Sequence, residues 1–209
     1  LTGRRRRRLW RVLGSTLGDV DVLPRSHVFL LEAVERLRAR RPDLRADLEA
    51  HFAGSMDAAD LAATTSDAVR LHGYLAHADA VALLRSADLL FLPMHDLPAP
   101  ARARIVPGKT YEYLASGRPI LAAVPDGDAR DLLARAGSAL LCRPRDVDCL
   151  ERTIESQADR KRRGDPPPAP DPAVVATVER RRLTELLARV LDGVLAGEEA
   201  PGGPASARR

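Results

Sequence analysis

Residues 107–122 read PGKTYEYLASGRPILA, and this stretch predicts how the surrounding chain folds. Thr110 to Ala115 has the composition of a short helix, which Gly117 ends, and Pro119 to Val124 follows as an apolar strand. A glycine just past the last turn is a usual helix stop signal. A short helix leading directly into an apolar strand is typical of the repeating unit of a parallel sheet.

The same alternation extends along the chain in both directions. The sequence predicts strands at residues 9–13, 49–53, 69–71, 89–92, 119–124 and 139–142, and helices at 26–41, 78–87, 110–115, 129–136 and 146–160. Leu89 to Leu92 is wholly apolar, as in strands buried on both faces. With right-handed crossovers, this pattern predicts an α/β fold: a doubly wound parallel sheet of the Rossmann type over residues 1–163.

The C-terminal region differs in composition. Residues 164–172 contain five prolines, which predicts a stiff linker. One amphipathic helix is expected over residues 173–196, with the apolar stripe Val175, Val178, Leu183, Leu186, Leu187, Val190, Leu191 and Val194. Residues 197–209 have the composition of a disordered tail.

Composition argues against several classes of protein. With 33 basic and 29 acidic residues the charges nearly balance, which disfavours a polyanion-binding protein. The run Arg4–Arg8 lacks aromatic partners, so we interpret it as a tail, not a nucleic-acid site. No apolar run reaches the length of a membrane span. Cys142 and Cys149 are expected to be free thiols in a reducing cytosol. The strong preference for arginine over lysine suggests a GC-rich bacterial genome.

Candidate binding residues follow the predicted strands, because ligands of open parallel sheets bind beyond the carboxyl ends of the strands. Gly14 follows the first strand, Gly73 and Tyr74 follow the third, and a long loop after the fourth leads to the helix that starts near Lys109. All three tyrosines and one of the two lysines fall in or beside these segments. This clustering favours a site at this edge of the sheet.

The residue types at this edge suit a nucleoside diphosphate. A helix N-terminus attracts phosphate, and Lys109 and Arg25 would add full positive charges. Glu112 can accept hydrogen bonds from two vicinal hydroxyls, as a ribose presents them. The alternative is that Lys109 and Glu112 form a surface ion pair, that Arg25 is merely solvated and that Tyr111 packs on the sheet. The aspartates 19, 21, 126 and 128 fit no known metal-binding loop.

The stretch 107–122 also resembles the "P-x-K-x-x-E-Y-L-A-x-G-x-P-I-L-A" segment of GT-B glycosyltransferases, most of all family 4, the group 1 enzymes. Flanking segments at 29–44, 51–54 and 69–88 resemble other parts of that family in the same order. The resemblance covers roughly residues 14–160. It implies the C-terminal, nucleotide-sugar-binding half of a GT-B fold.

The resemblance also implies roles for single residues. Glu112 would hold the ribose, and Lys109 and Arg25 would hold the diphosphate and act in catalysis. Gly14, Gly73 and Tyr74 would line the donor pocket, with Thr110 and Tyr111 in the same turn as Lys109. This sequence departs from the family pattern at two places. Arg104 occupies the position of the first glutamate of the family's pair, and residues 96–103 replace its E-G-F-G loop.

The activity that the resemblance implies is retaining transfer of a sugar from a UDP-, GDP- or other nucleotide-diphosphate sugar to a glycan, lipid or other acceptor, without a metal or other cofactor. Such enzymes need an N-terminal acceptor domain, so we expect this chain to be part of a longer one and inactive alone. The final helix would brace that missing half. The expected location is cytoplasmic, with room for association with the inner face of the membrane through the missing half.

Three other functions are considered. A non-catalytic nucleotide-binding or interaction module would keep the fold without transferring sugar. An epimerase of nucleotide sugars would need a pair of acid/base carboxylates in the cleft, and the sequence offers no convincing pair. Nucleic-acid binding would rest on Arg4–Arg8 alone.

Overall fold

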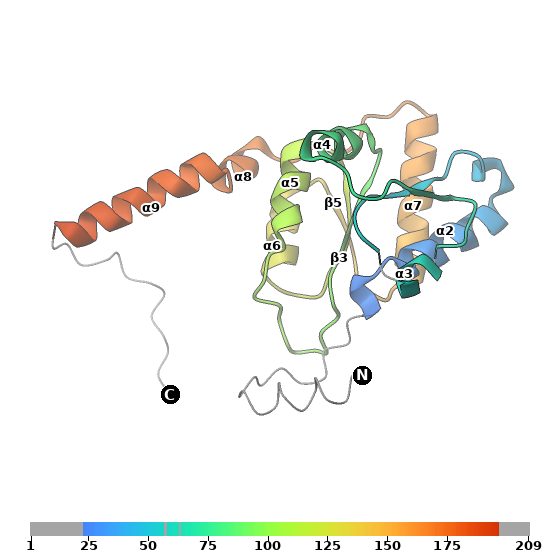
Figure 1. The fold of residues 1–209 in the computed structure, drawn as a ribbon, viewed down its shortest axis with the longest axis horizontal. Helices are drawn as coiled ribbons and strands as arrows, with labels where there is room; N and C mark the ends of the chain where they lie inside the picture. The colour runs from blue at the N-terminus through green and yellow to red at the C-terminus, as the bar shows by residue number, and fades with distance from the viewer. Residues whose placement is uncertain (1–22, 57, 63, 197–209) are drawn as a thin grey trace.

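A computed structural model describes residues 23–56, 58–62 and 64–196. Its strands are β1 (Ala50–Phe52), β2 (Val69–Leu71), β3 (Leu90–Pro93), β4 (Ile120–Ala123) and β5 (Ala139–Cys142). Its helices are η1 (Leu23–Arg25), α2 (Val28–Arg40), η2 (Pro42–Leu44), α3 (Ala58–Ala62), α4 (His77–Ser86), α5 (Gly108–Ser116), α6 (Asp128–Ala136), α7 (Val147–Arg162), α8 (Pro172–Thr177) and α9 (Arg180–Leu195) (Figure 1). The predicted order of strands and helices is confirmed from α2 to α7, apart from the short elements η2 and α3, which the sequence did not predict.

All strand pairs are parallel, as predicted. β4 lies between β3 and β5, with Ile120 opposite Leu90 on one side and Ala139 on the other. β1 and β2 form a separate pair in which Ala50 lies opposite Val69. The predicted first strand, residues 9–13, lies outside the described residues, as do the arginine run at 4–8 and the predicted tail at 197–209.

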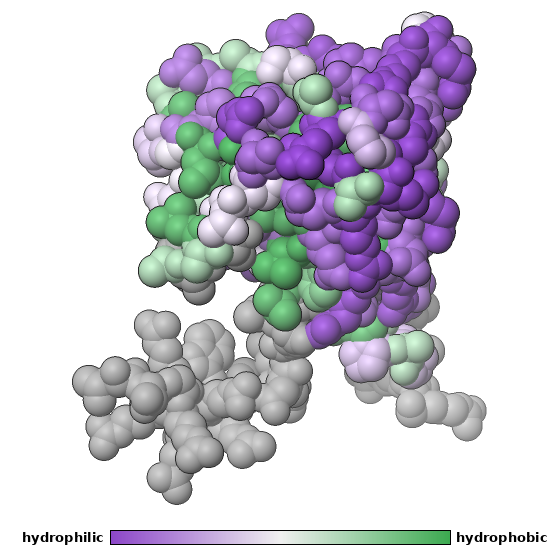
Figure 2. Space-filling view, turned by 90° about the vertical axis from the view of Figure 1, so that its right-hand side faces the viewer, coloured by the Kyte–Doolittle hydropathy of each residue, from purple (hydrophilic) through white to green (hydrophobic). Residues whose placement is uncertain are grey.

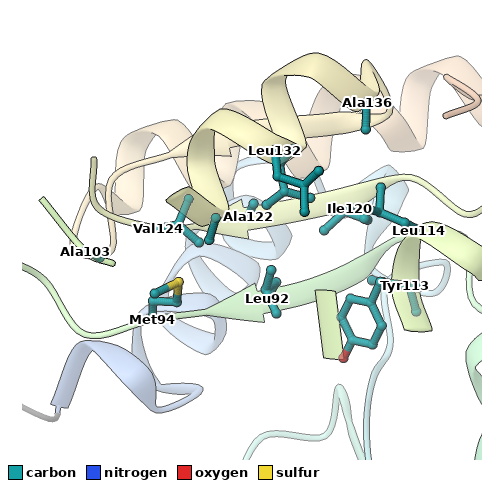
Figure 3. Packing of buried hydrophobic residues seen from close by; sticks show 13 residues of the cluster. Leu92, Met94, Ala103, Tyr113, Leu114, Ile120, Ala122, Val124, Leu132 and Ala136 are labelled. Carbon is teal, nitrogen blue, oxygen red and sulfur yellow. The ribbon is translucent and has the colours of Figure 1, made fainter. Parts of the chain in front are cut away.

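The sheet of β3, β4 and β5 is covered by helices on both faces, and the alternation of side chains along β4 shows how. Ile120 and Ala122 point into a cluster with α5 and α6, where Leu114 and Leu133 are almost fully buried (Figure 3). Leu121 and Ala123 point into a second cluster, which α2 and α7 cover. Burying one leucine contributes about 2 kcal/mol, so the two clusters fix the doubly wound arrangement.

β3 is buried less completely than its apolar sequence predicts. Leu90 and Leu92 are buried against α5 and α6, whereas Phe91 on the opposite face is only partly buried. Leu89 likewise packs only partly buried against the second cluster. The prediction of a strand buried on both faces is therefore confirmed for one face and only partly met on the other.

Ion pairs join α2 and η2 to α7. Arg40 donates to both oxygens of Glu155, and Arg41 donates to Glu155 and to Asp159. Arg162 in turn pairs with Asp43, and Arg41 and Arg162 together hold the pKa of that carboxyl well below its usual range. Because these side chains remain in part open to solvent, from 20% for Glu155 to 50% for Asp43, we assign them the role of aligning α2 on α7 more than of stabilising the fold.

The predicted free thiols are wrong, because Cys142 and Cys149 form a disulfide. Cys142 ends β5 and Cys149 lies in the first turn of α7, where its backbone N–H donates to the Asp146 side chain at 2.9 Å. This tight turn brings the two Cα atoms to 5.8 Å, within the usual disulfide range. A separation of seven residues gave no sign of this pairing, which depends on the geometry of the turn.

The prediction of a single helix over residues 173–196 is also wrong, since this region is divided into α8 and α9. Val178 leaves helical geometry and Glu179 is extended. Val174, Val175 and Val178 pack against the α5–α6 cluster, which holds α8 on the body of the protein. The chain turns at Val178 and α9 projects away from the body, where its apolar residues are exposed (Figure 1). None of the helices in the described ranges is long and apolar enough to cross a membrane.

Candidate functional site

The candidate site lies at the carboxyl edge of the three-stranded sheet. β3, β4 and β5 are parallel, so their carboxyl ends share one edge, and α5 and α6 both begin there. Residues 94–107 connect β3 to α5 and lie at the lower end of the molecule in Figure 1, where η1 also lies (Figure 1). This is the edge at which open parallel sheets bind ligands.

The start of α5, residues 108–112, presents three of the predicted site residues to solvent: Lys109, Tyr111 and Glu112 are exposed. Its N-cap is Pro107, which makes no side-chain cap, and no acidic residue lies in the first turn. Within the described part of the chain, neither Lys109 nor Glu112 forms an ion pair or a side-chain hydrogen bond, so the alternative of a Lys109–Glu112 surface pair is not observed. The turn is therefore free to receive an anion.

Below this turn, Thr110 and Tyr113 face the core. Thr110 is fully buried, and its hydroxyl has no hydrogen-bond partner among the described residues. Burial raises the pKa of the Tyr113 phenol above its usual range, and the neighbouring Glu112 carboxylate adds to this shift. Both residues thus support the turn from inside, while Tyr111 is 37% exposed.

The other predicted site residues are not joined to the α5 turn. Arg25 is exposed at the end of η1, just before α2. Gly73 follows β2 with a φ of +64°, and its carbonyl accepts from Gly54 N–H at 2.7 Å. Tyr74 is 87% exposed, and Gly14 lies outside the described residues. In the described ranges no hydrogen bond or ion pair connects Arg25, Gly73 or Tyr74 with Lys109 or Glu112.

The turn between β4 and α6 holds the end of the loop 94–107, which sequence reasoning missed. Ala103 N–H donates to Asp126 O at 2.8 Å, and Asp128 N–H donates to Ala103 O at 2.9 Å. Gly127 lies between these bonds with a φ of +146°, and a Cβ there would lie 2.1 Å from Ala103 O. Only glycine allows this approach.

Arg143, directly after β5, holds the start of the same loop. Its guanidinium donates to the Leu97 carbonyl at 3.2 Å, to Asp96 at 3.4 Å and to Asp126 at 3.0 Å. The signal for both Gly127 and Arg143 was their position just after strands β4 and β5, two of the three strand ends that the sequence search for ligands left out. In the residues that the structure describes, no three His, Cys, Asp or Glu side chains gather in a way that could hold a metal ion.

Two solved structures are similar to this chain. A structural neighbour is α,α-trehalose 6-phosphate synthase from Burkholderia multivorans, with 13% identity and a TM-score of 0.56 over 85% of this chain and 41% of that one. Anabaena HepE, solved with UDP and glucose, has 17% identity and a TM-score of 0.49 over 90% of this chain and 53% of that one. The chain thus spans about half the length of these structures or less, and no curated protein matches its sequence.

A family model covers most of the chain. The model described as "Glycosyl transferases group 1" matches residues 16–159, which include every described strand, the loop 94–107 and the first turn of α5. The fold of the synthase agrees with this match. The chain therefore belongs to the group 1 glycosyltransferases.

Proposed function

We propose that this chain is the donor-binding half of a glycosyltransferase that transfers a sugar from a nucleotide-diphosphate sugar to a glycan, lipid or other acceptor. The observation that carries the proposal is the start of α5, residues 108–112. There Lys109 and Glu112 are exposed, and neither pairs with another side chain of the described residues, beside a helix N-terminus without a side-chain cap. A diphosphate and a ribose present the two chemical groups that such a turn can bind.

In this proposal the α5 turn binds the nucleotide in two parts. Lys109 and the first N–H groups of α5 bind the diphosphate, and Arg25 adds a second positive charge from η1. Glu112 accepts hydrogen bonds from the ribose hydroxyls, and Tyr111, Gly73 and Tyr74 border the donor. Thr110 contributes by supporting the turn from the core, because its hydroxyl is fully buried.

Catalysis would be mainly electrostatic. As the sugar leaves the nucleotide, negative charge develops on the diphosphate, and groups already in place around it stabilise that charge. Lys109, Arg25 and the α5 N-terminus supply such groups without a metal ion. We propose that the reaction retains the anomeric configuration, as the group 1 resemblance implies.

The exposed face of α9 supports the need for a second half. Leu183, Leu187 and Leu191 are each about half exposed, on a helix that projects from the body. An exposed apolar face of this kind is typical of a surface that contacts another protein surface. We propose that an acceptor-binding domain covers α9 and closes the cleft over the donor, and that this half carries any contact with the membrane.

A non-catalytic module is the second candidate, and the same face of α9 favours it. A chain that binds a partner through α9 would keep the fold and need no donor. The two candidates differ in one property, because only the transferase requires that the α5 turn bind a nucleotide diphosphate.

Calorimetry on the 209-residue chain tests the proposal. UDP or GDP should bind, and the 2′-deoxy form of the nucleotide that binds should bind more weakly, because Glu112 loses one of its hydroxyl partners. Glu112→Ala should remove most of the difference between the two forms, whereas Glu185→Ala, on the exposed surface of α9, should keep it. Absence of heat with both nucleotides would contradict the proposal and favour the module.

A further inference from the structure

The loop of residues 94–107 carries the α5 turn, so its position decides where Lys109 and Glu112 lie. It joins Pro93, the last residue of β3, to Gly108, the first of α5, and its only bridge among the described residues pairs Ala103 with Gly127. A loop of this length without helix or strand loses considerable conformational freedom when it is ordered. Something must therefore hold it in place before a ligand arrives.

Arg143 makes three bonds that do this. It donates to the Leu97 carbonyl and to Asp96 on the loop, and to Asp126 on the β4–α6 turn. Asp126 also accepts the Ala103 N–H through its backbone carbonyl. The two ends of the loop are thus attached to one turn, and Arg143 is the side chain that connects the loop start to that turn.

Arg143 also balances charge at the carboxyl edge. Asp96 follows β3 and Asp126 follows β4, so both carboxylates belong to the carboxyl edge of the sheet, and their side chains are 25% and 48% exposed. A nucleotide diphosphate carries negative charge of its own. Without the guanidinium, Asp96 would lose the one ion pair that it makes among the described residues, and Asp126 would keep only its longer pair with Arg130 at 3.7 Å, so the negative charge left at this edge would repel that ligand.

We propose that Arg143 is a positioning residue of the donor site: it fixes the loop 94–107 on the β4–α6 turn and neutralises Asp96 and Asp126. This inference rests on the proposed donor-binding function. It assigns a role in that function to Arg143, which lies directly after β5 and makes no hydrogen bond to the start of α5 among the described residues. Arg143 acts through the loop and need not touch the nucleotide.

Hydrogen–deuterium exchange on the ligand-free chain tests the first part. Arg143→Gln should speed exchange of the amides in residues 96–103 by at least about tenfold, because local opening of the loop becomes easier. Arg118→Gln is the matched control: it removes an arginine just before β4, at the opposite edge of the sheet, and should leave these amides unchanged. Equal exchange in the Arg143 variant and the wild type would overturn the proposal.

Titration with UDP and GDP tests the effect on the site. Arg143→Gln should weaken binding about tenfold, and a triple variant that also carries Asp96→Asn and Asp126→Asn should recover a large part of that loss. No recovery would overturn the neutralising role. If the wild type binds and Arg143→Gln binds equally well, the positioning role fails while the donor-binding function stands. If the wild type binds neither nucleotide, the proposed function itself fails, and the role of Arg143 in it fails as well.

Discussion

Helices α5 and α6 occupy similar positions in the fold, but their N-termini make different contacts. Each has nine residues, follows an adjacent parallel strand, begins at the same edge of the sheet and ends at a glycine with a positive φ. The start of α6 is occupied: Gly127 contacts Ala103, and Asp131 in the first turn pairs with Arg102 of the loop. Neither helix has a side-chain cap, but the first turn of α5, unlike that of α6, contains no acidic residue.

The contrast shows how one edge serves folding and binding at once. An acid in the first turn satisfies the helix dipole from within the protein, and α6 has two, Asp128 and Asp131. α5 has Lys109 in that place, so the positive end of the helix and the ammonium add together. In the account proposed above, α6 anchors the loop and α5 is left for the donor.

The largest expected effect is a loss of stability, and it comes from adding a side chain at Gly127, where α6 contacts the loop. Gly127→Ala places a Cβ 2.1 Å from Ala103 O in a backbone conformation that alanine rarely adopts, which should cost about 4 kcal/mol of unfolding free energy. Gly54→Ala is the control, since Gly54 also has a positive φ, of +130°, but open space around it. Urea unfolding of both variants measures the difference, and equal losses would show that backbone strain alone, without the contact to the loop, explains the effect.

The next largest effect concerns the open start of α5. In a two-domain form of the enzyme, Lys109→Ala or Glu112→Ala should each lower the rate of sugar transfer at least about 100-fold, or about 2.7 kcal/mol of barrier. Thermal unfolding should stay nearly unchanged because both side chains are exposed and unpaired. Turnover near that of the wild type in both variants would show that the start of α5 takes no part in sugar transfer.

The C-terminal ends of the two helices should behave alike. Gly117 and Gly137 have φ values of +72° and +76°, and neither has an atom within 4 Å of the space for a Cβ. Replacing either by alanine should lower the unfolding free energy by about 1 kcal/mol through backbone strain. Chemical unfolding checks this, and a much larger loss at one site would mean that the helices differ at both ends.

The smallest effect comes from making the start of α5 resemble that of α6. Gly108→Asp places an acid at the first position of α5, where nothing lies within 4 Å of the new Cβ. The helix dipole and the loss of a flexible glycine should raise the unfolding free energy by about 0.5 kcal/mol, while affinity for UDP or GDP should fall. A stabilised variant with undiminished nucleotide binding would argue against a site at this turn.

The sequence predicted the helices and strands well because their signals are local. Helical spacing in α2 and α6, the stops at Gly117 and Gly137, and the apolar run of β4 each lie within one element. The position of Lys109 and Glu112 at a helix start was predictable for the same reason. Which face of the sheet each helix covers was not predicted, because β4 is apolar at every position and the alternation of its side chains between two clusters is seen only in the structure.

Contacts between segments distant in sequence were not predictable. The disulfide depends on how tightly the chain turns between β5 and α7, and the break after α8 depends on where the core of α5 and α6 ends. Arg143 meets residues 46 and 47 positions away, across two strands. A single sequence contains no local pattern for such a contact, so the residues that hold the loop became visible only in the structure.

The most direct test of the central claim uses the only two lysines of the chain. Lys109 lies at the open start of α5, and Lys161 lies on α7, where it pairs with Asp88. Calorimetric titration with UDP and GDP should show that Lys109→Ala weakens binding at least about tenfold, whereas Lys161→Ala keeps it within about twofold of the wild type. Equal affinities in the two variants would contradict a diphosphate site at the start of α5.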